Sequence, residues 1–206
     1  MIVEKTRTSY KFKKIKKGMK KIIFSLALIV ASISLISFTN GKIAADSFKV
    51  DAAKSKVNWT GSKKTDFHVG YFPVKSGAVQ VEGGKLVGGS FVIDIAGMKV
   101  TDDAGVKLEG HLSAPDFFDV AKFGQATYTI TSVNYTAGNK ATIAGELSLK
   151  GIKAPVSFTA YIRNTDEKGF FAEAFFPLDR TLFGINYGVG AIDSEVQLAV
   201  HLYATK

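Results

Sequence analysis

The chain has 206 residues, no cysteine and a formal net charge of +9. The positive charge is confined to one end, because residues 1–45 hold ten of the 27 Lys and Arg residues and one of the 18 acidic residues. The rest of the chain carries 17 side chains of each sign. This neutrality argues against nucleic-acid binding, which depends on clustered cations, and the lack of cysteine excludes disulfides and a lipid anchor on cysteine.

Residues 1–45 have the order of an export signal, in which basic residues precede an apolar run. Residues 19–21 supply the basic part, and residues 22–36 are apolar except for three serines. Such a run is shorter than the roughly 20 residues that cross a hydrocarbon core. The pattern therefore predicts a cleaved signal peptide rather than a retained membrane anchor.

Two features mark the ends of this leader. Met19 is a natural start, which makes residues 1–18 either an upstream extension or a lengthened basic region. Cleavage is expected after Thr39 or after Ala45. The sequence then predicts one exported, periplasmic domain at residues 46–206, a size that buries a core without disulfide bonds.

Past the leader, runs of β-branched and aromatic residues are separated by Gly, Asp, Asn and Pro. This punctuation is typical of an all-β barrel or sandwich. We predict strands at residues 57–63, 65–72, 75–81, 86–95, 126–135, 141–150, 156–163, 169–178 and 196–203. Gly88, Gly89 and Gly145 fall inside these runs, where a glycine either eases bending of the sheet or leaves room for another group.

The segment between the fourth and fifth predicted strands differs from the rest. Its residues Val106, Leu108 and Leu112 have helical spacing, and Phe117 and Phe118 follow them. This pattern predicts short helical turns. We expect them to cap one mouth of a barrel, with the two Phe rings closing it.

Three of the later runs alternate apolar and polar residues. In residues 156–163 every second residue, beginning with Val156, is apolar, and residues 141–150 and 196–203 repeat the pattern. Each strand then has one dry face and one wet face, as in a closed antiparallel barrel. About eight strands enclose an interior just wide enough for packed side chains or for one slender ligand.

The sequence contains no convincing catalytic or metal-binding motif. Its three histidines, His68, His111 and His201, lack cysteine partners and the close spacing of metal ligands. No serine occupies a strand-to-helix elbow, and no loop matches a calcium or phosphate site. We therefore expect no catalytic residue, no metal and no cofactor, and we assign the chain to binding proteins rather than enzymes.

Residues 111–123 form an aromatic connector that reads His-Leu-Ser-Ala-Pro-Asp-Phe-Phe-Asp-Val-Ala-Lys-Phe. Residues 145–156 contain Gly-Glu-Leu-Ser-Leu-Lys-Gly followed by Pro-Val, and residues 179–185 read Asp-Arg-Thr-Leu-Phe-Gly-Ile. With shorter matches in the earlier strands, these motifs resemble the YceI-like family over about residues 48–204. The resemblance implies an antiparallel, lipocalin-like β-barrel that holds a polyisoprenoid or another long-chain amphiphile.

The resemblance also implies which side chains contact the ligand; without it, a packed core is expected. The predicted tunnel wall consists of Trp59, Phe67, Phe72, Phe91, Ile93, Leu112, Phe117, Phe118, Phe123, Phe158 and Phe183. At the mouth we expect His68, His111 and Arg180. The guanidinium of Arg180 either meets a phosphate or hydroxyl head group or pairs with Asp179 or Asp193.

Three functions follow from these patterns. The leading hypothesis is an exported carrier that sequesters a polyisoprenoid or similar lipid and contacts membranes transiently. The alternative is a structural or stress-response interaction protein whose barrel is filled and holds no ligand. An enzyme acting on a lipid or quinone is the least favoured, and the sequence leaves open whether the protein is a homodimer.

Overall fold

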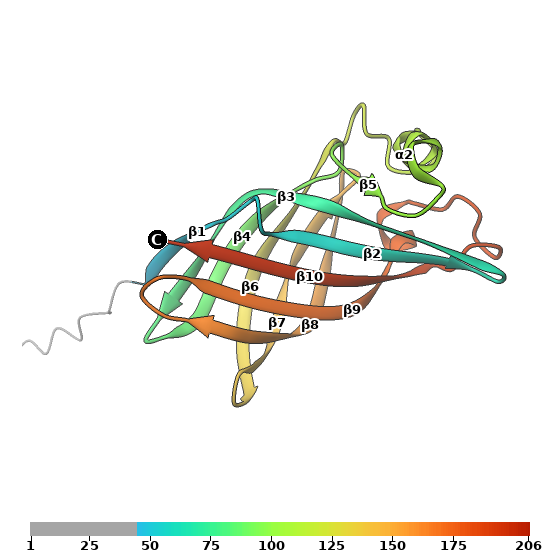
Figure 1. The fold of residues 1–206 in the computed structure, drawn as a ribbon. Helices are drawn as coiled ribbons and strands as arrows, with labels where there is room; N and C mark the ends of the chain where they lie inside the picture. The colour runs from blue at the N-terminus through green and yellow to red at the C-terminus, as the bar shows by residue number, and fades with distance from the viewer. Residues whose placement is uncertain (1–44) are drawn as a thin grey trace, which may run out of the picture. The chain divides into compact units, whose positions relative to one another are not determined.

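The computed structural model describes residues 45–206, which form a closed antiparallel β-barrel with one short α-helix (Figure 1). The predicted fold class is confirmed. The predicted leader lies outside the described residues except for its last position, Ala45.

Eight strands form the closed ring. They are β2 (Lys56–Lys63), β3 (Asp66–Glu82), β4 (Lys85–Asp94), β6 (Gln125–Ala137), β7 (Lys140–Leu149), β8 (Ile152–Thr165), β9 (Phe170–Asp179) and β10 (Glu195–Thr205). Each pairs with the next in that order, and β10 closes the ring by pairing with both β9 and β2. The short strands β1 (Asp46–Val50) and β5 (Lys99–Val100) pair with β3 outside this order.

The two ends of the barrel are covered differently. Figure 1 shows β5 and α2 (Gly105–Ser113) beside one end, which we call the lid end. The 3-10 turn η2 (Arg180–Phe183) belongs to the same end, because the Arg180 guanidinium lies 5.9 Å from the ring of Phe117 in the segment after α2. The opposite end, which we call the hairpin end, carries the turns β3–β4, β6–β7 and β8–β9.

The predicted alternation is present in β8. Val156, Ala160 and Ile162 are buried, whereas the residues between them are more exposed. Phe158 also faces inward but is only partly buried, because it borders the cavity described below. The dry face read from the sequence is therefore the inner face of the barrel.

The two strands predicted at residues 65–72 and 75–81 are one strand, β3. Its register against β4 shifts between Val74 and Ser76. Such an irregularity inserts an extra residue without ending the strand, so the break in alternation at Lys75 is not a strand boundary. The short strand β1 was not predicted from the sequence. It pairs with β3 and β10, the same two strands that flank β2.

The turn between β7 and β8 has only two residues. Lys150 and Gly151 have φ values of 51° and 76°. Two successive positive φ values match the turn type whose twist suits a tight hairpin. Glycine adopts this conformation readily, whereas Lys150 must be held in it by other contacts.

Candidate functional site

An apolar cavity of about 140 Å³ lies inside the barrel. All eight barrel strands contribute to its wall, from the lid end to the hairpin end. The wall consists of Val57, Val74, Val79, Leu86, Phe91, Ile93, Tyr128, Ile130, Ile143, Leu147, Val156, Phe158, Ala160, Ile162, Phe170, Ala172, Glu173, Ala174, Phe176, Leu178, Leu198, Val200 and Leu202.

Two of the lining residues are polar, and the side chains of both are engaged elsewhere. The Tyr128 hydroxyl donates to the carbonyl oxygen of Val156 at 3.0 Å, and burial raises the pKa of Tyr128 to about 12. The Glu173 carboxylate accepts from Arg163 Nε at 2.7 Å and lies 3.4 Å from His201 Nε2. The cavity wall therefore favours an apolar ligand and offers no free polar side chain to a head group.

Aromatic rings form one side of the cavity. Phe158 stacks on Phe176 with ring centroids 4.3 Å apart and an interplanar angle of 7°. The Tyr128 ring also contacts Phe158, tilted by 37° with the two ring centroids 5.6 Å apart. These three rings come from β6, β8 and β9, so their contacts join three strands inside the barrel.

Of the fourteen residues predicted to contact a ligand, three line the cavity: Phe91, Ile93 and Phe158. Other wall residues could have been predicted from the alternation of apolar and polar residues in β10, which puts Leu198 and Val200 on the inner face. In β9, paired Phe residues at 170–171 and 175–176 obscure which ring faces inward.

A second group of the predicted residues packs together at the lid end. Trp59 contacts Phe72, and Phe72 meets Phe118 edge to face, with ring centroids 6.3 and 5.5 Å apart. Phe117 packs against Phe118 at 5.7 Å, and Leu112 is buried in the same core. The indole Nε1 of Trp59 is buried and has no hydrogen-bond partner among the described residues.

The remaining apolar candidates occupy separate places. Phe183 in η2 is fully buried, and the Phe123 ring packs against Gly151, where a Cβ would come within 2.9 Å of it. Phe67 lies near the tip of the β2–β3 hairpin and is 60% exposed. The structure therefore does not bring these three side chains to the cavity.

Arg180 is 4% exposed, and its side chain donates hydrogen bonds to backbone carbonyls. Its guanidinium donates to the carbonyl oxygens of Ile185, Asp193 and Ile192 at 2.6, 3.0 and 3.2 Å. The Asp179 carboxylate accepts instead from the amide and hydroxyl of Thr181. Arg180 thus holds the loop after η2 in place, through carbonyl groups rather than through either of the carboxylates considered from the sequence.

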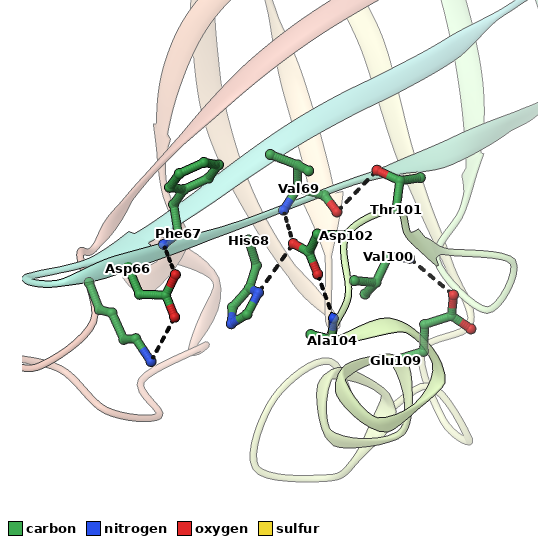
Figure 2. A network of polar contacts seen from close by, with 10 residues as sticks. Asp66, Phe67, His68, Val69, Val100, Thr101, Asp102, Ala104 and Glu109 are labelled. Atoms are coloured by element: carbon green, nitrogen blue, oxygen red, sulfur yellow. Dashed lines mark hydrogen bonds and ion pairs between the residues drawn. The ribbon is translucent and has the colours of Figure 1, made fainter.

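His68 belongs to a polar network that attaches the α2 segment to β3 (Figure 2). Asp102 Oδ2 lies 3.2 Å from His68 Nδ1 and accepts from the Val69 amide at 2.8 Å, while Oδ1 accepts from the Ala104 amide at 2.9 Å. The hydrogen bond from the Val69 amide is the largest cause that lowers the pKa of Asp102. One carboxylate therefore connects the β-barrel to the start of the helix.

The other two histidines have different surroundings. The His111 ring packs edge to face on Tyr187 and Phe117, with centroids 4.6 and 5.8 Å away. His201 lies on the outer face of β10, as its alternation predicts, beside Glu173 and Asn58. Within residues 45–206, no group of three or more His, Asp or Glu residues is arranged to hold a metal ion.

Lys150 is a structural residue that sequence reasoning missed. From the β7–β8 turn, its ammonium donates to the carbonyl oxygens of Pro115, Phe117 and Gly184. These carbonyls belong to the segment after α2 and to the end of η2. The Lys150 ammonium therefore joins two separate segments of the lid end to the β7–β8 turn.

In the part of the chain that the structure describes, no helix has the length and apolar character needed to cross a bilayer.

Comparisons with known proteins agree with this geometry. Residues 48–204 match the family model described as the YceI-like domain. A UPF0312 protein of Pseudomonas fluorescens is 26% identical over 203 residues, which cover 91% of this chain and 98% of that protein. Protein YceI of Salmonella arizonae is 35% identical over 106 residues, which cover 48% of this chain and about half (54%) of that protein.

Two solved structures share the fold. BcnA of Burkholderia cenocepacia has a TM-score of 0.66 and 25% identity, over 76% of this chain and 99% of that one. A polyisoprenoid binding domain from Saccharophagus degradans has a TM-score of 0.62 and 17% identity, over 77% of this chain and 97% of that one.

Proposed function

The chain belongs to the YceI-like family, and we propose that it binds a polyisoprenoid or similar long-chain lipid inside its barrel. The observation that carries the proposal is the apolar cavity, whose two polar side chains are both engaged with protein groups. The polyisoprenoid binding domain from Saccharophagus degradans has the same fold and supports this class of ligand.

The energetics favour a carrier over an irreversible trap. Each ligand CH₂ group buried from water contributes about 0.8 kcal/mol. A lipid delivered from a bilayer leaves surroundings as apolar as the cavity, so this gain largely cancels. Net exchange then depends on the shape of the cavity and on a few polar contacts of the head group.

Organic extraction of the purified protein, followed by mass spectrometry, tests the proposal. The protein should be produced in a lipid-replete host and extracted after thorough removal of membranes. We expect one class of long-chain lipid in stoichiometric amount. A folded protein that carries no lipid and takes none up from vesicles would favour the filled-barrel alternative, a structural or stress-response interaction protein.

The proposal assigns no catalytic role to the cavity. Glu173 is the acidic residue of the wall, and its carboxylate is directed to Arg163 and His201. The Tyr128 hydroxyl is occupied by the carbonyl of Val156. A lipid recovered chemically unchanged after incubation supports binding, whereas turnover of a lipid or quinone would support an enzyme.

We also propose export to the periplasm, from the basic and apolar order of residues 1–45. Removal of the leader would release a neutral domain that starts near Asn40 or Asp46. Intact-mass measurement of the protein from its native host tests this. A membrane-bound protein that retains residues 20–36 would contradict the proposal.

A further inference from the structure

The barrel wall is incompletely paired between β4 and β6. The ladder between them runs from the Asp94–Gln125 pair at the lid end to the Ser90–Thr129 pair near the middle. Both strands continue toward the hairpin end, β4 back to Lys85 and β6 on to Ala137, without further pairs between them. On its other side, β6 remains paired with β7 as far as Ala137. The two strands therefore part over half their length; we call this opening the slot.

The slot reaches the cavity. Ile130 of β6 and Leu86 of β4 border the slot, and both line the cavity. The inward-facing Ile130 and Val133 are only partly buried, whereas Ile143, on β7 directly behind Val133, is 2% exposed. On the β6 side of the slot the interior side chains are thus less completely buried than on β7, whereas Leu86 on the β4 side is 4% exposed.

One hydrogen bond spans the slot. The backbone amide of Leu86 donates to the hydroxyl oxygen of Tyr135 at 2.7 Å. The Lys85 ammonium lies 5.4 Å from the centroid of the same ring. The Tyr135 side chain on β6 thus replaces the backbone hydrogen bonds that would otherwise join β4 to β6 here. A single side-chain hydrogen bond breaks more easily than a ladder of backbone hydrogen bonds.

The two ends of the barrel are closed more firmly than the slot. At the lid end, Arg180 and Lys150 each bind three backbone carbonyls, and Phe183 is fully buried. At the hairpin end, Phe48 and Phe170 are each 2% exposed. Passage through either end would disrupt close packing or several hydrogen bonds at once.

We propose that the ligand enters the cavity sideways through the slot, and that Tyr135 is the latch that controls this entry. The inference rests on the proposed lipid-binding function. A flexible apolar chain slides between the parted strands, while the unpaired backbone amides and carbonyls along the slot supply the polar partners that the cavity lacks. The head group of the lipid therefore stays at the slot.

Replacing the latch tests the proposal, and Tyr161→Phe is a matched control. Both tyrosines have a Lys ammonium over the ring, 5.4 Å from the centroid of Tyr135 and 5.3 Å from that of Tyr161, but Tyr161 lies on β8, away from the slot and outside the cavity wall. The probe is a pyrene-labelled long-chain alcohol in phosphatidylcholine vesicles, and its rate of transfer to the protein is measured by fluorescence. We expect Tyr135→Phe to speed transfer about fivefold, the rate equivalent of one ordinary hydrogen bond, and Tyr161→Phe to leave the rate unchanged. Equal rates in the two variants and the wild type would overturn the latch.

A reversible cross-link tests the slot itself. Ser90 Oγ and Thr129 Oγ1 lie 3.3 Å apart on the last pair before the slot, and the chain has no other cysteine to interfere. Oxidised Ser90→Cys/Thr129→Cys should load the probe several-fold more slowly, and a reductant should restore the rate. The control pair, Thr142→Cys/Thr159→Cys, joins β7 to β8 away from the slot.

These outcomes separate the two proposals. If the wild-type protein takes up no probe, the lipid-binding function itself fails. If it takes up the probe and neither the latch variant nor the slot disulfide changes the rate, binding stands and lateral entry is overturned. Slowing by both disulfides equally would also overturn the slot, because it would indicate a general stiffening of the barrel.

Discussion

The ring of Tyr128 on β6 occupies the space that a Cβ on Gly145 of β7 would need. A Cβ built on Gly145 would lie 2.5 Å from the Tyr128 Cζ, 2.6 Å from its hydroxyl oxygen and 2.5 Å from the carbonyl oxygen of Thr129. The sequence leaves two roles open for Gly145: it eases bending of the sheet, or it leaves room for another group. The contact fits the second role, because the missing side chain makes room for the Tyr128 ring of the neighbouring strand.

Gly145→Ala should therefore destabilise the barrel. Overpacking of this kind typically costs about 1 to 3 kcal/mol, measured as the free energy of unfolding in urea. Gly61→Ala in β2 is the control, because a Cβ there meets nothing within 4 Å; we expect a change within about 0.5 kcal/mol of zero. Equal effects in the two variants would show that the Tyr128 contact does not decide the stability.

Phe158→Trp should reduce the space for a ligand without unfolding the protein. Phe158 borders the cavity, so the larger ring has free volume to enter, and the bound chain should become shorter or be lost. Phe183→Trp is the control, because Phe183 is fully buried and away from the cavity; overpacking there should cost about 1 to 3 kcal/mol. Thermal unfolding and mass spectrometry of extracted lipid measure both effects. Unchanged lipid with lost stability in Phe158→Trp would contradict the assignment of the cavity as the binding site.

Lys150→Met should loosen the lid end. The substitution leaves the carbonyls of Pro115, Phe117 and Gly184 without their shared donor, and a lost hydrogen bond to a charged group costs about 1.5 to 3 kcal/mol. Hydrogen exchange should quicken in the segments around Phe117 and Gly184. Lys153→Met, which removes an exposed pair with Glu146, should leave exchange there unchanged. If the two variants behave alike, the carbonyl contacts are not what holds the lid end.

We expect the contribution of Asp102 to the stability of the folded protein to be lost in acid. Its pKa is lower in the folded protein than the ordinary value of 3.8, chiefly through the Val69 amide. A carboxyl group with a depressed pKa stabilises the fold above its unfolded pKa, and this contribution is lost as the pH falls through the folded value. Wild-type protein should therefore be more stable than Asp102→Asn at neutral pH, and the difference should shrink below about pH 4. A difference that does not vary with pH would contradict the role of this carboxylate.

The sequence predicted the inner faces of the strands better than it predicted what those faces enclose. Alternation placed Phe158 inside, because a strand has only two faces. Sequence patterns do not show that Phe158 borders a cavity whereas Phe183 is fully buried. The space around each ring depends on how strands and turns distant in the sequence pack together. Arg180 shows a similar limit: its charge suggested a ligand contact, whereas the fold of the following loop directs carbonyls at it. The slot was equally invisible, because the extent of a ladder depends on register and local twist rather than on composition.

The placement of β10 decides when this protein can fold. Its residues pair with β9, β2 and β1, including Lys49 with Thr205, so the last strand of the ring in chain order completes both sides of it. Sheets built from pairings so distant in sequence form slowly. A nascent chain lacking residues 195–205 has two open sheet edges and no closed interior. The ring can therefore close only after β10 has been synthesised.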